Sequence, residues 1–267
     1  MPDRPASGSS PIDSIRLVER FERAQPGFTF QATSLPGHLI HLVLQGEVEQ
    51  TCNGRRQRLS PGTIVWYHED EWVEGRVVTA PWIYCSVNFS APTLAPPDFN
   101  ARLQSNRGDL APIFTSLLAA WRQEPSALRD LQCQARLLDL LAALHPQTQT
   151  APVSTPAGRL WWEVETWVRQ NIARHLSLTE LCAKFHRSPN TLARACLDAV
   201  GLPPMKRLKQ IRLSLARGLV HYSDLNMTEI ALRVGYARVH EFSRDYRKAH
   251  GLPPTTDRIK HLATPAK

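Results

Sequence analysis

Two short stretches in the last third of the chain carry side chains that can read a nucleic-acid sequence. Asn190 and Arg194 lie in the first stretch. In the second, Arg244 stands seven residues before Gly251, as Arg194 stands seven before Gly201. In the major groove of DNA, Asn forms paired hydrogen bonds with adenine and Arg with guanine, and Arg also binds phosphate. These residue types favour recognition of bases and phosphates over catalysis.

The second stretch has the apolar spacing of two short helices joined by a tight turn. Ile230, Ala231 and Val234 recur at helical spacing after Thr228, and Gly235 then accepts the left-handed backbone that ends a helix. A basic run follows, whose apolar stripe consists of Val239, Phe242 and Tyr246. Two helices in this arrangement form a helix-turn-helix, whose second helix enters the major groove.

The chain contains this pattern twice. Gly201–Pro204 (GLPP) recurs fifty residues later as Gly251–Pro254, and Thr179–Leu181 (TEL) recurs as Thr228–Ile230 (TEI). Such self-similarity indicates a duplicated supersecondary unit. In the first copy, Ser188 followed by proline predicts a sharp helix start, because serine caps a helix and proline fits its first turn. The sequence therefore predicts two helix-turn-helix motifs.

A single helix over Pro204–Tyr222 is expected between the two motifs. Its buried residues should be Leu208, Ile211, Leu215 and Leu219. Its exposed residues should be Lys206, Arg207, Lys209, Arg212 and Arg217. At about 1.5 Å per residue it spans roughly 28 Å, close to the ~34 Å between successive major-groove faces. The two motifs should therefore read one face of DNA, at an asymmetric site because their residues differ.

The motif TEIALRVGY…FSR…HGLPP resembles the C-terminal DNA-binding domain of the AraC/XylS family of bacterial transcription regulators. The resemblance covers roughly Trp161–Arg258. It implies that the positions facing the bases are Asn190, Ala193, Arg194, Val239, His240 and Arg244. Thr191 and Arg238 stand beside them, where either would contact phosphate or only water. The family also implies RNA polymerase as a partner, with activation as the commoner mode of regulation.

Two positions depart from the family pattern. His186 stands where the first turn usually carries glycine, although histidine tolerates a positive φ better than most residues. Asp257 stands where an aromatic residue commonly closes the domain. We therefore expect the last turn to pack less firmly in this chain.

Charge is distributed unevenly along the 267 residues, which are enough for two domains. Residues 1–158 hold 13 Arg, no Lys and 15 Asp+Glu, a net charge of −2; residues 159–267 hold 19 Lys+Arg and 9 Asp+Glu, a net charge of +10. Only the C-terminal part should meet a polyanion such as double-stranded DNA. Without a leader or a long apolar stretch, we expect a cytoplasmic protein that does not span a membrane.

The region from Ile12 to Ala101 has short β-type runs broken by turns. The predicted strands are 38–45, 47–52, 55–59, 63–68, 76–79 and 82–89. Asn53-Gly54 and Pro61-Gly62 signal turns, and Gly46 separates two runs that could pair. This pattern predicts a β-sandwich or barrel. LVLQGEVE…LSPGTIVWY is similar to the cupin-type (jelly-roll) sensor domain common in the same family.

A barrel of this kind could hold a metal ion or a small molecule. His38 and His41 are three residues apart and should point to opposite faces of a strand, while His68 stands alone. We therefore expect no metal site, and neither metal nor other cofactor. For a small effector, sugar-like or aromatic, the candidate residues are His41, Trp66, Trp72, Trp82 and Tyr84. The alternative for each aromatic residue is a place in the core.

Residues 102–145 are expected to form two amphipathic helices. Asp109 is the candidate cap of the first. The apolar face of the second should consist of Leu128, Leu131, Ala135, Leu138 and Ala142, widened by Leu137, Leu141 and Leu144. The pair could cover the barrel or join two subunits, as the family resemblance implies. Residues 146–158 are rich in Pro, Thr and Ala and form the predicted linker.

The combined pattern predicts an α+β multidomain protein. Its parts are a tail (1–11), a cupin-like sensor domain (12–101), a helical pair that could dimerise (102–145), a linker (146–158) and a double helix-turn-helix domain (159–260). The predicted function is sequence-specific transcription regulation, with activation favoured, controlled by an effector in the barrel. The alternatives are a cupin-type metal enzyme carrying a DNA-binding appendage and a structural nucleoid protein. We find no nucleophile or metal-ligand pattern, and so expect no enzyme.

Overall fold

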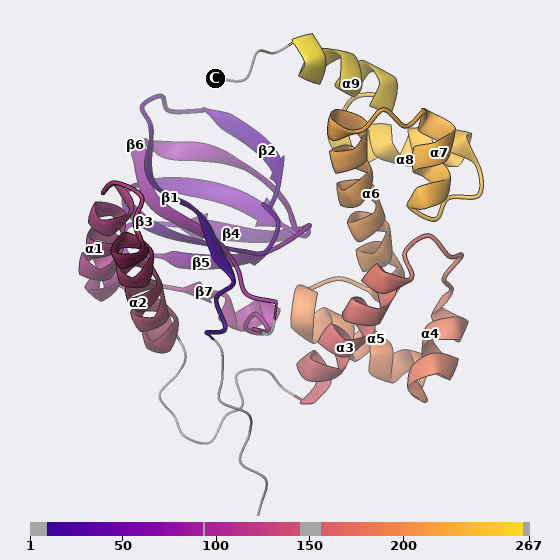
Figure 1. Cartoon of the computed structure of the whole chain (residues 1–267), viewed down its shortest axis with the longest axis horizontal. Helices are drawn as coiled ribbons and strands as arrows, with labels where there is room; N and C mark the ends of the chain where they lie inside the picture. Colours follow the sequence, from indigo (N-terminus) through magenta and orange to yellow (C-terminus); the bar gives the residue numbers. More distant parts are fainter. Residues whose placement is uncertain (1–9, 93, 145–155, 264–267) are drawn as a thin grey trace, which may run out of the picture. The chain divides into compact units, whose positions relative to one another are not determined.

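The computed structural model describes residues 10–92, 94–144 and 156–263. The chain divides between Thr155 and Pro156 into a β-rich unit and a helical unit (Figure 1). This confirms the expected α+β architecture. Most of the predicted linker and of the predicted tail lies outside the described residues, and the last three linker residues, 156–158, belong to a helix.

The first unit is built on antiparallel strands that form one strongly bent sheet. The strands are β1 (Ser14–Arg23), β2 (Thr29–Thr33), β3 (His38–Cys52), β4 (Arg55–Leu59), β5 (Ile64–His68), β6 (Trp72–Ser90) and β7 (Leu103–Gln104). Their order is β1-β6-β3-β5-β7, with β2 also paired to β6 and β4 to β3. We did not predict β1, β2 or β7 as strands.

Four of the predicted strands belong to two long strands. The runs 38–45 and 47–52 are parts of β3, and the runs 76–79 and 82–89 are parts of β6. The runs on either side of Gly46, which could have paired with each other, are instead the two halves of β3, and both pair with β6. Gly46 has φ 76°, and a Cβ there would lie 2.5 Å from the carbonyl oxygens of Thr79 and Pro81. The register shifts between Val43 and Val48. Such bulges bend a sheet, so each long strand serves two halves of the barrel.

The two faces of the sheet have separate cores. One face packs against α1 (Ala111–Trp121) and α2 (Ala127–Leu144), which lie side by side along it (Figure 1). Its buried residues include Ile40, Trp66 and Phe89. The other face lines the inside of the barrel. Its buried residues include Tyr67, Trp82 and Tyr84.

Two details of the helical pair differ from expectation. Asp109 does not cap α1; its carboxylate accepts a hydrogen bond from Arg107 Nε at 3.1 Å, and the N-cap residue is Leu110. The buried face of α2 consists of Cys133, Leu137, Leu140, Leu141 and Leu144. The three residues expected to widen the apolar face, Leu137, Leu141 and Leu144, are thus buried. The main predicted stripe lies on the opposite side and is exposed, with Leu128 and Leu131 each 64% accessible. Two apolar stripes compete on this helix, and the sheet selects the one that carries more leucines.

The second unit consists of helices in which the internal duplication is visible. They are α3 (Pro156–Gln170), α4 (Leu178–Phe185), α5 (Pro189–Val200), α6 (Pro204–Tyr222), α7 (Met227–Arg233), α8 (Val239–His250) and α9 (Pro254–Ala263). Ser177 and Asn226 begin α4 and α7 with equivalent capping boxes. Gly201 and Gly251 end α5 and α8 with left-handed backbones, at φ 73° and 76°.

The connecting helix α6 has the predicted bounds, and Leu208 and Ile211 are buried as expected, but its faces differ from the prediction elsewhere. Leu208 packs in the core of the first motif, whereas Leu213, Ala216 and Val220 pack in the core of the second. Serving two cores rotates the buried stripe along the helix. Leu215 is therefore 42% exposed although we expected it inside. Arg207, which we expected outside, is fully buried.

Candidate DNA-binding surface and ligand cavity

The first helix-turn-helix motif consists of α4 and α5. His186 ends α4 in the left-handed conformation, with φ 52°, so it fills the position usually held by glycine, as expected. Ser188 caps α5 by accepting a hydrogen bond from the backbone N–H of Thr191 at 3.2 Å. On α5, Asn190, Thr191 and Arg194 are exposed. Their side chains stand free of the core that fixes the helix.

The second motif consists of α7 and α8. Gly235 lies in its turn with φ 85°, and a Cβ there would lie 2.3 Å from the carbonyl oxygen of Ile172. On the outer side of α8, the predicted residues Arg238, His240 and Arg244 are exposed. The motif thus presents three polar side chains beside a buried stripe of aromatic residues.

The predicted DNA-reading residues fall into two groups by exposure. The exposed ones are Asn190, Thr191, Arg194, Arg238, His240 and Arg244. Ala193 and Val239 are half-buried, which limits them to short apolar contacts such as that with a thymine methyl group. Sequence reasoning did not include Arg247, which is exposed three residues after Arg244. Its helical spacing from Arg244 was the signal that could have identified it.

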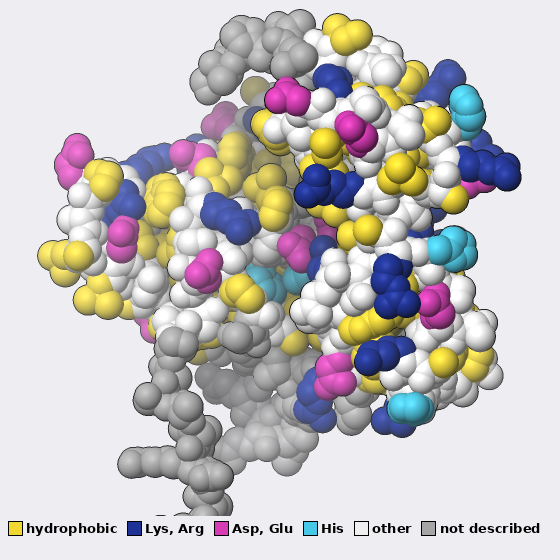
Figure 2. Space-filling model, turned by 45° about the vertical axis from the view of Figure 1, so that its right-hand side comes forward, with side chains coloured by type: hydrophobic (Ala, Val, Ile, Leu, Met, Phe, Trp, Pro, Cys, Tyr) yellow, Lys and Arg dark blue, Asp and Glu magenta, His cyan; other side chains and the backbone are white. Residues whose placement is uncertain are grey.

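The surface around these residues is basic. Figure 2 shows Lys and Arg side chains spread over the helical unit, among apolar ones. Arg194 forms no ion pair with any described residue, and Arg244 lies 3.5 Å from Asp245 while remaining 75% exposed. A pair so open to water contributes little, so the Arg244 guanidinium stays available to a phosphate or a base.

Three polar contacts of α6, the first of them fully buried, fix the two motifs to each other. Arg207 of α6 binds Glu165 of α3 with both side chains buried. Lys209 binds Asp245 of α8 at 2.7 Å. Arg212 donates to the carbonyl oxygen of Arg174 at 2.7 Å. These contacts join α6 to α3, to α8 and to the segment before α4. The connecting helix therefore holds the two motifs together.

Asp257 fastens the last helix. Its carboxylate accepts a hydrogen bond from the Tyr246 hydroxyl at 2.6 Å and lies 3.2 Å from His221 Nε2 and 3.4 Å from Arg217 Nε. Burial, together with this hydrogen bond, raises the pKa of the Tyr246 hydroxyl. The expectation that the last turn packs less firmly is therefore wrong, because a partnered carboxylate takes the place of an aromatic side chain.

The β-rich unit contains a cavity of about 300 Å³ on its inner face. Three of the predicted effector residues line it: His41, Trp82 and Tyr84. Trp66 and Trp72 do not. Trp66 lies on the opposite face of the sheet, where its Nε1 donates a hydrogen bond to His38 Nδ1 at 3.2 Å.

Sequence reasoning missed the part of the cavity wall that β1 and β2 supply. Arg23 comes from β1, Phe30 and Ala32 come from β2, and Tyr67 comes from β5. The missed signal was weak, because charged residues interrupt the alternation along β1. Burial lowers the pKa of His41 to about 3, so this ring is neutral at physiological pH.

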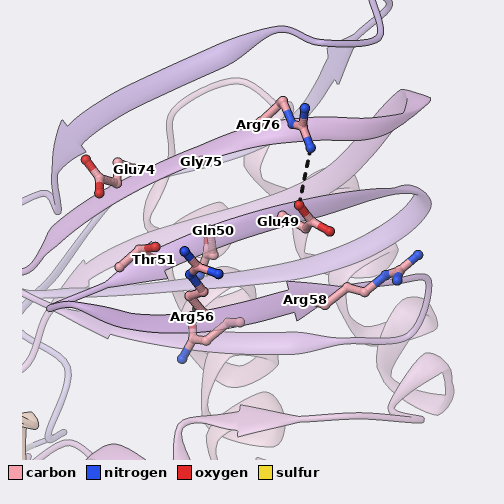
Figure 3. Close-up of a pocket in the computed structure, with 9 residues that line it drawn as sticks. Glu49, Gln50, Thr51, Arg56, Arg58, Glu74, Gly75 and Arg76 are labelled. Atoms are coloured by element: carbon pink, nitrogen blue, oxygen red, sulfur yellow. Dashed lines mark hydrogen bonds and ion pairs between the residues drawn. The ribbon is translucent and has the colours of Figure 1, made fainter.

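A second hollow, of about 530 Å³, lies where β3, β4 and β6 run together (Figure 3). Its walls carry both signs of charge, including Arg56, Glu74 and the pair formed by Arg76 and Glu49 at 3.4 Å. Both members of that pair are more than half exposed. Because this hollow is open and carries arginines beside glutamates, its lining indicates the charge of a ligand less clearly than the lining of the aromatic cavity does.

The possible metal-ligating side chains of the described residues do not cluster into a metal site. Within the described part of the chain, no group of three or more His, Cys, Asp or Glu residues is arranged to hold a metal ion. His38 stacks on Phe89 on one face of the sheet, whereas His41 contacts Tyr67 and Tyr84 on the other. The same described residues contain no helix long and apolar enough to cross a membrane.

Together, a barrel with an inner cavity and a double helix-turn-helix domain define a ligand-responsive class of DNA-binding proteins. Residues 17–151 match the model of the AraC-like ligand binding domain, and residues 181–259 match that of a helix-turn-helix domain. The first match alone spans half of the chain. The protein belongs to the AraC/XylS family of transcription regulators.

Among characterised proteins, the chain is similar to the transcriptional activator RhaS. It is 33% identical to RhaS of Escherichia fergusonii over 142 residues, 53% of this chain and 42% of that protein. It is 33% identical to RhaS of Klebsiella pneumoniae over 88 residues, 33% of this chain and 32% of that protein. The matches thus span less than half the length of these relatives.

The fold is similar to that of ToxT from Vibrio cholerae. The structure of ToxT with a bound unsaturated fatty acid covers 96% of this chain and 99% of its own, with a TM-score of 0.61 and 12% sequence identity. At such identity the likeness shows a shared fold. It confirms the arrangement of a β-rich first unit and a helical second unit.

Proposed function

We propose that this protein is a sequence-specific, DNA-binding transcription activator, and that its barrel senses a small molecule. The observation that carries this proposal is the pair of unlike, exposed residue sets on α5 and α8, which the polar contacts of α6 hold together. RhaS is named as an activator, which supports activation here. RNA polymerase is the partner that activation requires, and the bacterial cytoplasm is where both meet DNA.

The effector acts by shifting a conformational equilibrium. A ligand in the barrel cavity favours whichever state binds it better, and so changes the population competent to bind DNA. That ToxT holds a fatty acid supports a ligand role for this fold. DNase footprinting on genomic fragments, with and without effector, tests both parts: a discrete protected site supports DNA recognition, and a change in its affinity supports sensing.

Dimerisation is proposed through α2. Its exposed stripe consists of Leu128, Leu131, Ala135, Leu138 and Ala142. Their spacing alternates three and four residues, which is the pattern of a two-helix seam. Leu128 and Leu131 would each lose a largely exposed apolar surface when a second copy of α2 packs against them. A dimer places two double-motif domains on one DNA molecule.

The enzyme alternative has no support in the described residues. A cupin-type metal centre needs a cluster of ligands on one wall, and the two histidines of β3 face opposite sides. The family is one of transcription regulators, and we propose no catalytic activity.

A further inference from the structure

We infer that the barrel cavity binds a small, flat aromatic carboxylate. The inference rests on the proposed sensor function, because it names the chemistry of the ligand that this cavity would sense. Three features of the cavity lead to it: a row of stacked rings, a single arginine without a carboxylate partner, and a lining in which several polar groups are already paired within the protein.

The first feature is a continuous row of aromatic rings across three strands. Phe30 of β2 stacks on Trp82 of β6, with ring centroids 5.5 Å apart and an interplanar angle of 16°. Trp82 stacks on Tyr84 at 4.2 Å and 26°, and Tyr84 stacks on Phe21 of β1 at 5.3 Å and 26°. Because these rings stack on one another, their edges remain for a ligand, and an aromatic ligand can meet those edges with its own face in edge-to-face contact.

The second feature is the charge of Arg23. Among the residues that the structure describes, it is the only charged one that lines the cavity, and no Asp or Glu of that part of the chain lines it. Its guanidinium carbon lies 5.6 Å from the ring centre of Phe28 and 5.8 Å from that of Phe21. Among the described residues its guanidinium has no carboxylate partner; Nη1 donates only to the carbonyl oxygen of Glu22, at 3.2 Å. A carboxylate on the ligand would supply the missing charge, in the fork geometry that Arg prefers.

The third feature argues against a sugar. Sugar hydroxyls need several acceptors as well as donors, but Gln50 Oε1 accepts from the Tyr67 hydroxyl at 2.8 Å, and Gln50 Nε2 donates to Gln57. The Ser34 hydroxyl donates to the carbonyl oxygen of His68. Among the described residues, Trp82 Nε1 is a buried donor without a hydrogen-bond partner. Together with the Arg23 guanidinium, this indole gives the lining donors that a carboxylate can use.

The volume of the cavity limits the size of the ligand. A volume of about 300 Å³ lies at the lower end of the range of ligand pockets, roughly 300–1,000 Å³. One ring or a fused pair carrying a carboxylate suits such a space. A long alkyl chain carries no ring and therefore gains no aromatic contact with this row.

The test measures binding to the full-length protein by calorimetry. The probes are benzoate and indole-3-acetate, each beside its neutral carboxamide, together with a hexose and octanoate. We expect the two aromatic acids to bind, the amides to bind about tenfold to a hundredfold more weakly, as loss of a charge-assisted hydrogen bond implies, and the hexose not to bind. Octanoate should bind more weakly than either aromatic acid.

A pair of variants locates the carboxylate. Arg23→Gln should remove the difference between acid and amide, whereas Arg20→Gln should keep it, because Arg20 is an exposed arginine of the same strand that does not line the cavity. The acid–amide comparison on the unaltered protein stands even if Arg23→Gln fails to fold. Equal binding of acid and amide, preference for the hexose or octanoate, or no binding of either aromatic acid would each overturn the inference.

Footprinting separates this inference from the proposed function. If the aromatic acids bind as expected but leave DNA affinity and transcription unchanged, the ligand class stands and the sensing role falls. If no aromatic acid binds while the protein still protects a discrete DNA site, the ligand class falls and DNA recognition stands.

Discussion

Arg207 donates two hydrogen bonds to the carboxylate of Glu165, from Nε at 2.9 Å and from Nη2 at 2.7 Å, and both side chains are buried. The contact joins α6, which connects the two motifs, to α3, which opens the helical unit. Arg169 and the indole of Trp161 complete the coordination of the same carboxylate, at 2.7 Å and 3.0 Å. The relative placement of the two recognition helices therefore depends on a polar contact inside the core.

Removing one partner of this contact should strongly destabilise the helical unit. Glu165→Ala leaves the buried Arg207 guanidinium without its carboxylate, and breaking a buried pair in this way costs about 3–5 kcal/mol. Urea unfolding followed by circular dichroism measures the loss. The control Arg136→Ala removes one member of an exposed pair with Asp139 and should change stability by less than about 1 kcal/mol. Equal effects of the two substitutions would contradict the structural role.

Gly235→Ala should weaken both folding and DNA binding. Gly235 has φ 85°, a backbone that costs other residues roughly 1–2 kcal/mol. A Cβ there would also lie 2.3 Å from the Ile172 carbonyl oxygen, so the turn must move away from residues that precede the first motif. Thermal unfolding and footprinting should both show the defect. The matched control is Gly218→Ala in α6, where a Cβ meets nothing within 4 Å; it should stabilise slightly or leave stability unchanged.

Acid should destabilise the β-rich unit through His38 and His41. Burial lowers the pKa of His38 to about 4 and that of His41 to about 3, whereas the unfolded chain titrates near 6.5. Below pH 6.5 the unfolded state therefore takes up protons that the folded state refuses, and stability falls by up to about 1.4 kcal/mol per pH unit for each histidine.

Denaturant unfolding between pH 7 and pH 5 measures this slope. His41→Gln removes one of the two groups and should flatten the dependence. A slope for His41→Gln as steep as that of the unaltered protein would show that His41 is protonated in the folded barrel.

Leu131→Glu on α2 should produce monomers. The substitution places a charge in the centre of the exposed apolar stripe, where a second α2 is proposed to pack. Thr115→Glu adds the same charge at an exposed position of α1 and should leave the dimer intact. Sedimentation velocity over a range of concentrations distinguishes the two species. An unaltered protein that stays monomeric throughout, or a Leu131→Glu variant that still dimerises, would rule out this interface.

Local signals in the sequence predicted most of the helical unit. Ser188 before proline, the left-handed His186 and the two recurring glycines each act within a few residues, so their effect does not depend on distant contacts. Local signals of this kind could not predict that Arg207 is buried. Its burial depends on Glu165, 42 residues earlier, and a basic residue on a helix otherwise belongs outside.

Only part of the cavity wall was predicted from the sequence, because the rest depends on contacts between residues far apart in the chain. The alternation along β6 correctly put Trp82 and Tyr84 on one face, whereas Trp66 of β5, which we also expected in the cavity, lies on the opposite face. The sequence did not show that the face of Trp66 is closed by α1 and α2, nor that Arg23 and Phe30 join the other face from β1 and β2. Those relationships arise from pairing between strands far apart in the chain.

The most direct test of sequence-specific recognition is footprinting of genomic DNA fragments at roughly 0.15 M salt with the unaltered protein, Arg244→Ala and Arg159→Ala. Arg159 is an exposed arginine at the start of α3, so it controls for loss of one positive charge. The unaltered protein and Arg159→Ala should protect a discrete site of about two helical turns, and Arg244→Ala should lose selectivity at one end of it. Uniform binding of all fragments by all three proteins, with the same salt dependence, would show that the helices act only as a basic surface.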